Sequence, residues 1–232
     1  RSSVLHALGM SLPDAVNLSA RDTVVPVVPM FHAYAWGLPH SATMVGARQV
    51  LPGPYLDAES LLDLFAETGA TFAGGVPTIW MGILQALQKE PSRWKLTEGL
   101  RMLVGGSATP QALIKGLDAF KLRVICAWGL TETSPLASVS TLRPELSLRS
   151  EDEQLWHRAQ AGIPLPLVDL RITNDEGEAG WDGQAVGEIE VRGPWVTGEY
   201  FNRPDAADRF SADGWFKTGD VASMTPEGTI HI

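Results

Sequence analysis

Short apolar runs alternate with segments of helical periodicity between residues 20 and 126. The runs TVVPVV, RQVL, ATFAGGV, LRMLV and RVICAW have the length of buried strands, and amphipathic stretches separate them. Such an alternation is typical of a mainly parallel sheet with flanking helices. We therefore predict an α/β fold for this part of the chain.

Two of the amphipathic stretches carry signals for the ends of a helix. In residues 57 to 69, Asp57 can cap the helix and Gly69 can end it. In residues 109 to 120, Thr109 is the expected cap and Pro110 the first helical residue. Both helices are expected to pack against the sheet through leucine, isoleucine and phenylalanine side chains at helical spacing: Leu61, Leu62, Leu64, Phe65, Leu113, Ile114, Leu117 and Phe120.

The pattern changes near residue 160. Residues 143 to 160 are polar and charged, and they predict an exposed linking helix. From Gly162 onward, short strands such as GEIEVRG and GTIHI alternate with glycine, Asn-Asp and Asp-Gly turns. We predict two units, an α/β subdomain over residues 1–160 and a small, mainly antiparallel β subdomain over residues 161–232.

Composition and charge exclude some classes of partner. The 232 residues carry a formal net charge of −9, which gives no general attraction to nucleic acid. The one cysteine, Cys126, lies in an apolar run and cannot form an intramolecular disulfide, so a reducing, cytoplasmic location is expected. No stretch approaches the roughly 18 consecutive apolar residues of a membrane-spanning helix.

The stretch AWGLTETS directly follows the predicted strand RVICAW. Ligands of open α/β sheets bind at the carboxyl ends of strands, which favours a site here. Trp128 offers a flat face for a base, Gly129 allows close approach of the backbone, and Thr131 and Thr133 offer hydroxyls to phosphate oxygens. Glu132 is a hard oxygen ligand of the kind that Mg²⁺ binds beside substrate phosphates. The stretch suits a magnesium nucleotide, although a packed tryptophan followed by a turn and a helix cap explains it equally well.

Two further stretches have the residues of a nucleotide site. GGSATP, residues 105 to 110, follows another predicted strand, and its paired glycines leave room for a flat ligand. In GWFKTGD, Asp220 can accept hydrogen bonds from the two hydroxyls of a ribose. Each stretch alone is also an ordinary turn signal. The chain contains neither GxGxxG nor GxxxxGK[ST], so it has no dinucleotide fingerprint and no Walker loop.

Five motifs in a fixed order carry a resemblance to a known family. VPMFHAYAW, GGSATP, AWGLTETS, GEIEVRGPWVTGEYFNRP and GWFKTGD together resemble the adenylate-forming superfamily of acyl-CoA synthetases, luciferases and peptide-synthetase adenylation domains. The resemblance spans nearly the whole chain. The stretch VPMFHAYAWGLPHSATMVGARQVLPGP is most similar to bacterial medium- and long-chain fatty acyl-CoA ligases.

The resemblance implies an activity. In that family a carboxylate attacks the α-phosphate of ATP, pyrophosphate leaves, and the thiol of coenzyme A then attacks the acyl-adenylate. The substrates implied are therefore ATP, a fatty acid and coenzyme A, with Mg²⁺ as the metal. Peripheral membrane association and a homodimer are left open.

The same resemblance assigns roles to residues, in three groups. Trp128 would stack on adenine, with Gly105, Gly106 and Ser107 as the opposite wall, and Gly129, Thr131 and Asp220 would complete the nucleotide site, Asp220 at the ribose. The catalytic group would be Thr131 at phosphate, Glu132 as the Mg²⁺ ligand and His32 beside the substrate carboxylate. The acyl tunnel would be lined by Trp36, Val76 and Pro77, with Trp36 as its gate. Taken alone, His32 could instead be a core histidine and Trp36 a packing residue.

The chain departs from the family pattern at both ends. The family's phosphate loop would precede RSSVLHAL, and its hinge and C-terminal lid would follow GTIHI. We therefore expect a central segment of a longer protein, here called the parent, and expect the segment alone to be inactive. Many relatives have glycine where Leu167 stands, so the turn there is expected to differ.

The sequence is also compatible with two other functions. One is a non-catalytic nucleotide- or acyl-binding module. The other is an adenylation domain for a different carboxylic acid. An amino-acid substrate would need a buried acidic partner for its ammonium group, and related domains have aspartate where this chain has His32.

Overall fold

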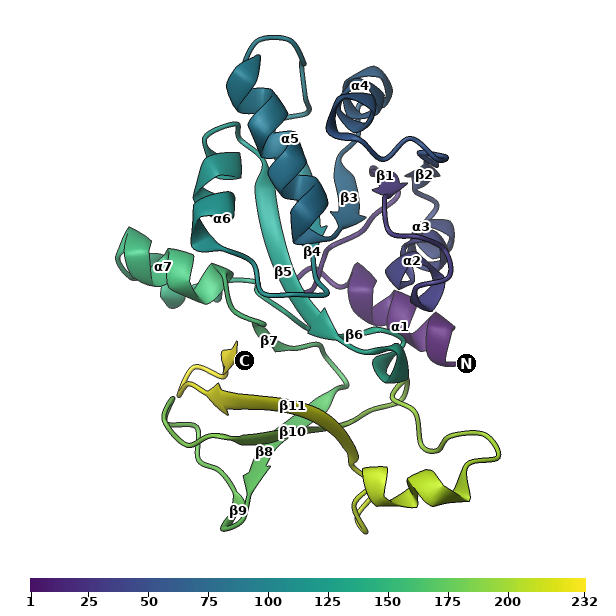
Figure 1. Ribbon diagram of the computed structural model, residues 1–232, viewed down its shortest axis with the longest axis vertical. Coiled ribbons are helices and arrows are strands. Elements are labelled where there is room, and N and C mark those ends of the chain that lie inside the picture. The colour runs from purple at the N-terminus through teal and green to yellow at the C-terminus, as the bar shows by residue number, and fades with distance from the viewer.

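The computed structural model describes residues 1–232 and contains two sheets (Figure 1). The first has seven strands in the order β2-β1-β3-β4-β5-β6-β7, and the second has five in the order β12-β11-β10-β8-β9. This arrangement confirms the predicted α/β fold followed by an antiparallel β region.

The predicted apolar runs supply the parallel part of the first sheet. These strands are β1 (Thr23–Pro26), β2 (Arg48–Gln49), β3 (Phe72–Gly75), β4 (Arg101–Val104) and β5 (Arg123–Gly129). All the ladders that join them are parallel. Two antiparallel strands then extend the sheet beyond β5, namely β6 (Leu136–Val139) and β7 (Ile163–Pro164). The first sheet thus includes a strand that lies after residue 160.

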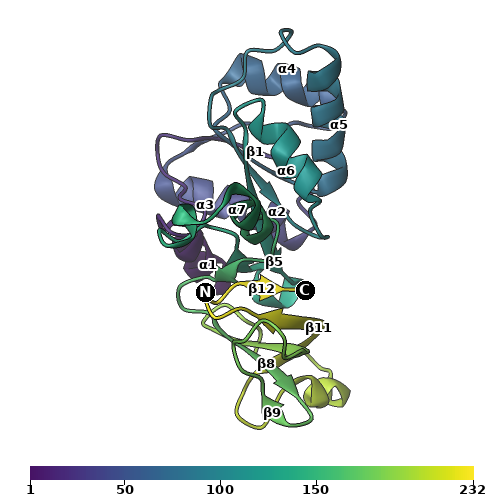
Figure 2. The same ribbon diagram turned by 90° about the vertical axis from the view of Figure 1, so that its left-hand side faces the viewer.

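Helices cover both faces of the first sheet. They are α1 (Ser2–Ser11), α2 (Ala33–Trp36), α3 (Leu38–Val45), α4 (Ala58–Thr68), α5 (Pro77–Lys89), α6 (Gln111–Asp118) and α7 (Glu151–Arg158). Figure 2 shows α4, α5 and α6 on one side and α1 and α3 on the other. Because successive strand side chains point to opposite faces, Val25 and Met102 join the core under α4 to α6, whereas Val24 and Leu103 join the core under α1 and α3. None of these helices is long and apolar enough to cross a membrane.

One predicted helix cap is confirmed and the other is wrong. The Asp57 side chain accepts a hydrogen bond from the Ser60 amide, and Gly69 ends α4 in the left-handed conformation. Helix α6 begins only at Gln111, with Pro110 as its N-cap and no side-chain cap. Thr109 is buried one residue further upstream. Pro110 has ψ 134, which is an extended and not a helical conformation, so the helix begins one residue later than predicted.

The helix in the linking segment, residues 143–160, is shorter than predicted. A 3-10 turn, η2 (Leu146–Leu148), precedes α7, which has no buried residue. Helix α7 is tied to α6 by Arg158, whose two terminal nitrogens donate to the Asp118 carboxylate at 2.7 Å each. The segment is therefore an exposed connection that is anchored to the first sheet.

The second sheet is antiparallel throughout. It consists of β8 (Asp169–Asn174), β9 (Gly177–Glu178), β10 (Gly187–Arg192), β11 (Phe216–Met224) and β12 (Ile230–His231), with the 3-10 helix η3 (Pro204–Arg209) in the connection from β10 to β11. Leu167, in the turn before β8, has φ +75. A leucine therefore adopts the conformation that glycine favours.

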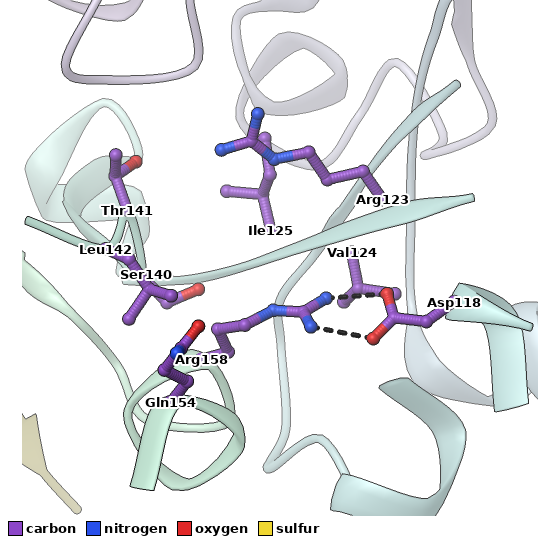
Figure 3. A pocket seen from close by; sticks show the side chains of 9 residues that line it. All are labelled: Asp118, Arg123, Val124, Ile125, Ser140, Thr141, Leu142, Gln154 and Arg158. Atoms are coloured by element: carbon purple, nitrogen blue, oxygen red, sulfur yellow. Dashed lines mark hydrogen bonds and ion pairs between the residues drawn. The ribbon is translucent and has the colours of Figure 1, made fainter. Parts of the chain in front are cut away.

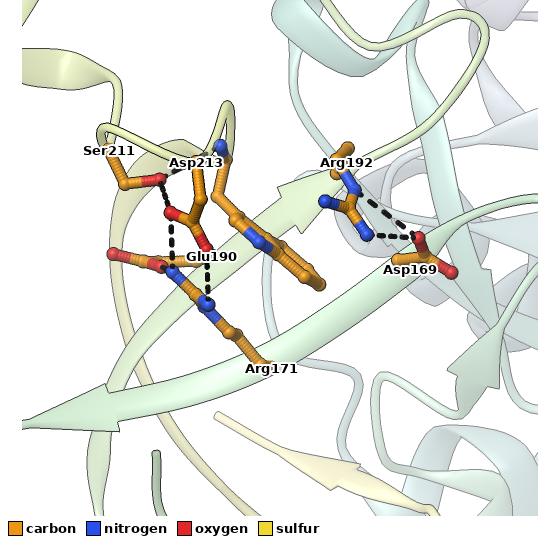
Figure 4. Close-up of polar contacts among 7 residues, drawn as sticks. Asp169, Arg171, Glu190, Arg192, Ser211 and Asp213 are labelled. Carbon is orange, nitrogen blue, oxygen red and sulfur yellow. Dashed lines mark hydrogen bonds and ion pairs between the residues drawn. The ribbon is translucent and has the colours of Figure 1, made fainter. Parts of the chain in front are cut away.

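Charged side chains bridge the strands on one face of the second sheet (Figure 4). Arg171 on β8 donates to Glu190 on β10 at 2.7 Å and to Asp213 at 2.9 Å. Hydrogen bonds from Ser211 and Arg171 lower the pKa of Asp213 to about 2. The Arg171 guanidinium also lies 4.4 Å from the ring centre of Trp215. These contacts hold together the part of the molecule that carries the Asp220 motif.

Candidate functional site

The predicted motifs gather at one edge of the first sheet. Strands β1, β3, β4 and β5 run in parallel, so their carboxyl ends lie at the same edge (Figure 1). Val76 follows β3, Gly105 follows β4, and Gly129 ends β5. The edge is the position at which open α/β sheets bind ligands.

Trp128 and Asp220 meet across the two sheets. The indole nitrogen of Trp128 on β5 donates to Asp220 Oδ2 on β11 at 2.8 Å. The Asp220 amide donates to Thr218 Oγ1 at 3.1 Å, and the buried Thr218 hydroxyl donates to the Ile189 carbonyl at 2.8 Å. The residues predicted to bind adenine and ribose, Trp128 and Asp220, therefore lie side by side. Hydrogen bonds within and between β10 and β11 hold Asp220 in place.

Arg209 supports the turn that carries Asp220. Its guanidinium donates to the carbonyl oxygens of Lys217 and Thr218 at 2.9 and 3.2 Å. It also lies 5.6 Å from the ring centre of Phe216. Sequence reasoning missed this residue because nothing in the spacing of DRFSADGWFKTGD shows that its arginine folds back onto the Thr-Gly-Asp turn.

The Thr-Glu-Thr stretch forms the 3-10 turn η1 (Thr131–Thr133). Thr131 is exposed, and Glu132 is half-buried. Thr133 is fully buried, its hydroxyl accepts a hydrogen bond from the Leu130 amide at 2.8 Å, and it lies against the Pro135 carbonyl. The hydroxyl of Thr133 is therefore engaged within the turn, contrary to the prediction that it meets phosphate.

Gly129 is required by the turn itself. A Cβ atom at this position would lie 1.9 Å from the Pro135 carbonyl oxygen and 3.0 Å from Thr133 Oγ1. The close backbone approach predicted at this glycine is thus made by the chain's own residues.

The carboxylate of Glu132 is held by a residue from the loop between β10 and β11. Tyr200 Oη donates to Glu132 Oε1 at 2.6 Å, and the Thr197 amide donates to the Glu132 carbonyl at 2.8 Å. Burial raises the pKa of the Tyr200 phenol, and the hydrogen bond to Glu132 and the charge of Glu132 raise it further. The phenol is therefore a protonated donor at neutral pH. Sequence reasoning did not single out Tyr200, because the contact joins residues 68 positions apart.

The donor set fits one kind of metal binding. No group of three or more His, Cys, Asp or Glu side chains lies close enough together to hold a metal ion. A single carboxylate with a free oxygen is what Mg²⁺ uses when waters and substrate phosphates supply its other ligands. Glu132 fits that arrangement, and a dedicated protein cage is absent.

The predicted acyl-tunnel residues pack against the predicted adenine wall. A Cβ atom on Gly105 would lie 3.3 Å from Trp36 Cη2, and one on Gly106 would lie 3.7 Å from Val76 Cγ1. Pro77 is buried at the first position of α5, whereas Ser107 is exposed. Trp36 and Val76 therefore lie directly over the 105–106 backbone, so the two predicted subsites share a border.

Trp36 belongs to a left-handed turn. Ala33, Tyr34, Ala35 and Trp36 have φ between +39 and +56, and Gly37 continues at φ +72. The left-handed conformation costs about 1–2 kcal/mol for each residue that carries a Cβ. Strained backbone of this kind is concentrated at functional sites, and its position beside Gly105 and Gly106 fits that association.

His32 lies just before this turn and is exposed. Its ring lies against Phe31, with 4.8 Å between ring centres, and it makes no hydrogen bond. The alternative that it is a core histidine is therefore wrong. The structure does not join it to Thr131 or Glu132 by any contact.

A hollow of about 300 Å³ lies at the opposite edge of the first sheet (Figure 3). It is lined by Arg123, at the start of β5, and by the Arg158–Asp118 ion pair. None of the predicted site residues lines it. This hollow is therefore separate from the predicted site.

A family model described as AMP-binding enzyme matches residues 2–201. The chain belongs to the AMP-binding enzyme family. This assignment confirms the family resemblance read from the five ordered motifs.

Individual members of the AMP-binding enzyme family are similar over the whole chain. A long-chain-fatty-acid CoA ligase of Thermus thermophilus is 45% identical over 100% of this chain and 43% of its own length. A medium-chain-fatty-acid CoA ligase of Ectopseudomonas oleovorans is 46% identical, again over 100% of this chain and over 42% of its own length. The crystal structure of a long-chain-fatty-acid CoA ligase from Archaeoglobus fulgidus superposes with a TM-score of 0.83 at 25% identity, over 99% of this chain and 46% of that one. The chain thus spans less than half the length of these relatives.

Proposed function

We propose that this chain is the nucleotide- and acyl-binding core of a fatty-acid CoA ligase. The parent would activate a fatty acid with ATP to acyl-AMP, release pyrophosphate, and transfer the acyl group to coenzyme A. The observation that carries the proposal is the shared border at the carboxyl edge, where Trp36 and Val76 lie on the Gly105–Gly106 backbone. An acyl carboxylate and an α-phosphate that react with each other need binding sites that touch.

The named relatives support the choice of substrate. The two ligases named above, at 45% and 46% identity, act by name on fatty acids and coenzyme A. An amino-acid substrate would need a buried acidic group for its ammonium, and at that position this chain has His32, which is exposed and not acidic. A fatty acid therefore fits better than an amino acid.

Each group of residues has a distinct task in this proposal. Trp128 and Asp220 would bind adenosine, and Thr131 would donate to a phosphate oxygen. His32 would lie beside the acyl carboxylate. Glu132 would hold Mg²⁺, which neutralises phosphate charge when it is bound. Positioning and charge stabilisation of this kind are the main sources of rate in phosphoryl-type chemistry.

The test is exchange of labelled pyrophosphate into ATP by the parent, dependent on fatty acid and carried out without coenzyme A. Exchange requires reversible acyl-adenylate formation, so it reports the first half-reaction alone. A cytoplasmic location, inactivity of the isolated segment, peripheral membrane association and a homodimer stay predictions about the chain and its parent.

Replacing Trp36 with alanine in the parent is expected to change the preference among acyl-chain lengths by roughly tenfold, the size of discrimination that apolar pockets provide. The affinity for ATP should change little, because Trp36 borders the acyl side of the Gly105–Gly106 wall. The measurement is kcat/KM over a series of fatty acids, together with the Kd for ATP.

Trp181→Ala is the matched control, since Trp181 is exposed and lies in the turn before β10. An equal loss for every acid together with a lower melting temperature would identify Trp36 as a packing residue and contradict the tunnel assignment.

A further inference from the structure

The loop between β10 and β11 contacts Glu132 at two points. The Thr197 amide holds the main-chain carbonyl, and the Tyr200 hydroxyl holds one carboxylate oxygen. Glu132 lies in the turn η1 between β5 and β6 of the first sheet, whereas both donors lie in the loop that joins β10 and β11 of the second sheet. The position of this carboxylate is thus set jointly by the two sheets.

The hydrogen bond from Tyr200 orients the Glu132 carboxylate and leaves one of its oxygens free to bind a metal ion. The phenol donates to Oε1 at 2.6 Å, and no protein group donates to Oε2. A carboxylate with one oxygen fixed and the other free can bind a cation without losing its orientation. Metal-binding carboxylates are usually hydrogen-bonded in this way, and removal of such a partner costs about 10–100-fold in metal affinity or activity.

The ring of Tyr200 is itself fixed by aromatic packing. Its centre lies 6.1 Å from that of Phe210 and 6.3 Å from that of Phe216, in edge-to-face arrangements. Phe216 is a fully buried core residue of the second sheet. Because the ring makes these contacts and the hydroxyl makes the bond to Glu132, a phenylalanine at this position would keep the packing and lose only the bond.

We propose that Tyr200 is a positioning residue that orients the Glu132 carboxylate toward the divalent cation of a bound nucleotide. The inference rests on the proposed function, since it takes Glu132 as the metal ligand. It adds that the loop between β10 and β11, through Tyr200, controls metal binding by Glu132 in the turn between β5 and β6.

The experiment compares Tyr200→Phe with wild type in the parent protein. Mn²⁺ replaces Mg²⁺, and its binding in the presence of ATP is followed by the relaxation of water protons. Tyr200→Phe should weaken Mn²⁺ binding about 10–100-fold, with an unchanged melting temperature and an unchanged KM for the fatty acid. Tyr55→Phe is the matched control, because Tyr55 is exposed and makes no side-chain hydrogen bond.

A double-mutant cycle separates positioning from a general structural effect. In a Glu132→Gln background, Tyr200→Phe should cause no further loss of Mn²⁺ affinity. Unchanged or tighter Mn²⁺ binding by Tyr200→Phe, or an equal loss in both backgrounds, would overturn the inference. If the wild-type parent neither binds Mn²⁺ with ATP nor exchanges pyrophosphate, the proposed function fails first.

Discussion

Replacing Glu132 with glutamine in the parent should slow adenylation by about 10²-fold or more, the usual cost of losing one preorganised electrostatic group at a reacting phosphate. Glutamine has nearly the same volume and can still accept the bond from Tyr200, so the turn η1 should remain intact. The charge that would bind Mg²⁺ is removed. The measurement is the rate of acyl-AMP formation in a single turnover at limiting Mg²⁺.

Glu67→Gln provides the control for this loss of charge, because Glu67 is exposed on α4. It should leave the single-turnover rate unchanged. An unchanged rate in Glu132→Gln at limiting Mg²⁺ would show that Glu132 has only a structural part in the turn, and the metal assignment would fall.

Gly129→Ala should remove most of the activity by displacing the turn that carries Thr131 and Glu132. The added Cβ would lie 1.9 Å from the Pro135 carbonyl oxygen, which is backbone and cannot rotate away. Relief of the overlap requires the 129–135 segment to move, and overpacking of this kind typically costs about 1–3 kcal/mol or more. The melting temperature and the adenylation rate of the parent test the prediction together, and both should fall.

Gly82→Ala is the matched substitution. Gly82 lies within α5, and a Cβ there would meet only Ala58 Cβ at 3.7 Å, an ordinary contact. Alanine favours the helix by about 1 kcal/mol over glycine, so this variant should be as stable as wild type or more stable. If Gly129→Ala behaved like Gly82→Ala, the turn could not have the backbone packing described here.

The architecture could be predicted from the sequence wherever the local hydrophobic pattern matched the tertiary structure. The five predicted runs correspond to the five parallel strands. Four of them are mostly buried or half-buried and apolar on both faces, as parallel strands usually are, whereas the edge strand β2 consists of Arg48 and Gln49 and is not buried. The edge β7 was assigned to the wrong sheet, because two residues carry too little pattern to show which strand they pair with. Thr109 was predicted to be the N-cap of α6, but Pro110 adopts an extended conformation and takes that position instead.

The position of the candidate site in the fold could be predicted from the sequence, but the contacts among its residues could not. Residues that follow parallel strands must lie at one edge, so Gly105 and Trp128 could be placed there from sequence. The bonds of Tyr200 to Glu132 and of Trp128 to Asp220 depend on how the second sheet meets the first, which no local spacing encodes. The left-handed turn at Ala33 to Trp36 was equally hidden, since AYAW contains no glycine or asparagine to signal a positive φ.

Fatty-acid-dependent exchange of pyrophosphate into ATP tests the proposed activity most directly. The purified parent would be incubated with ATP, Mg²⁺, labelled pyrophosphate and a series of medium- and long-chain fatty acids, in the absence of coenzyme A. We expect label to enter ATP only when a fatty acid is present and the rate to fall sharply in Glu132→Gln. A folded parent that gives no exchange above the acid-free background with any acid in the series would contradict the assignment as a fatty-acid CoA ligase.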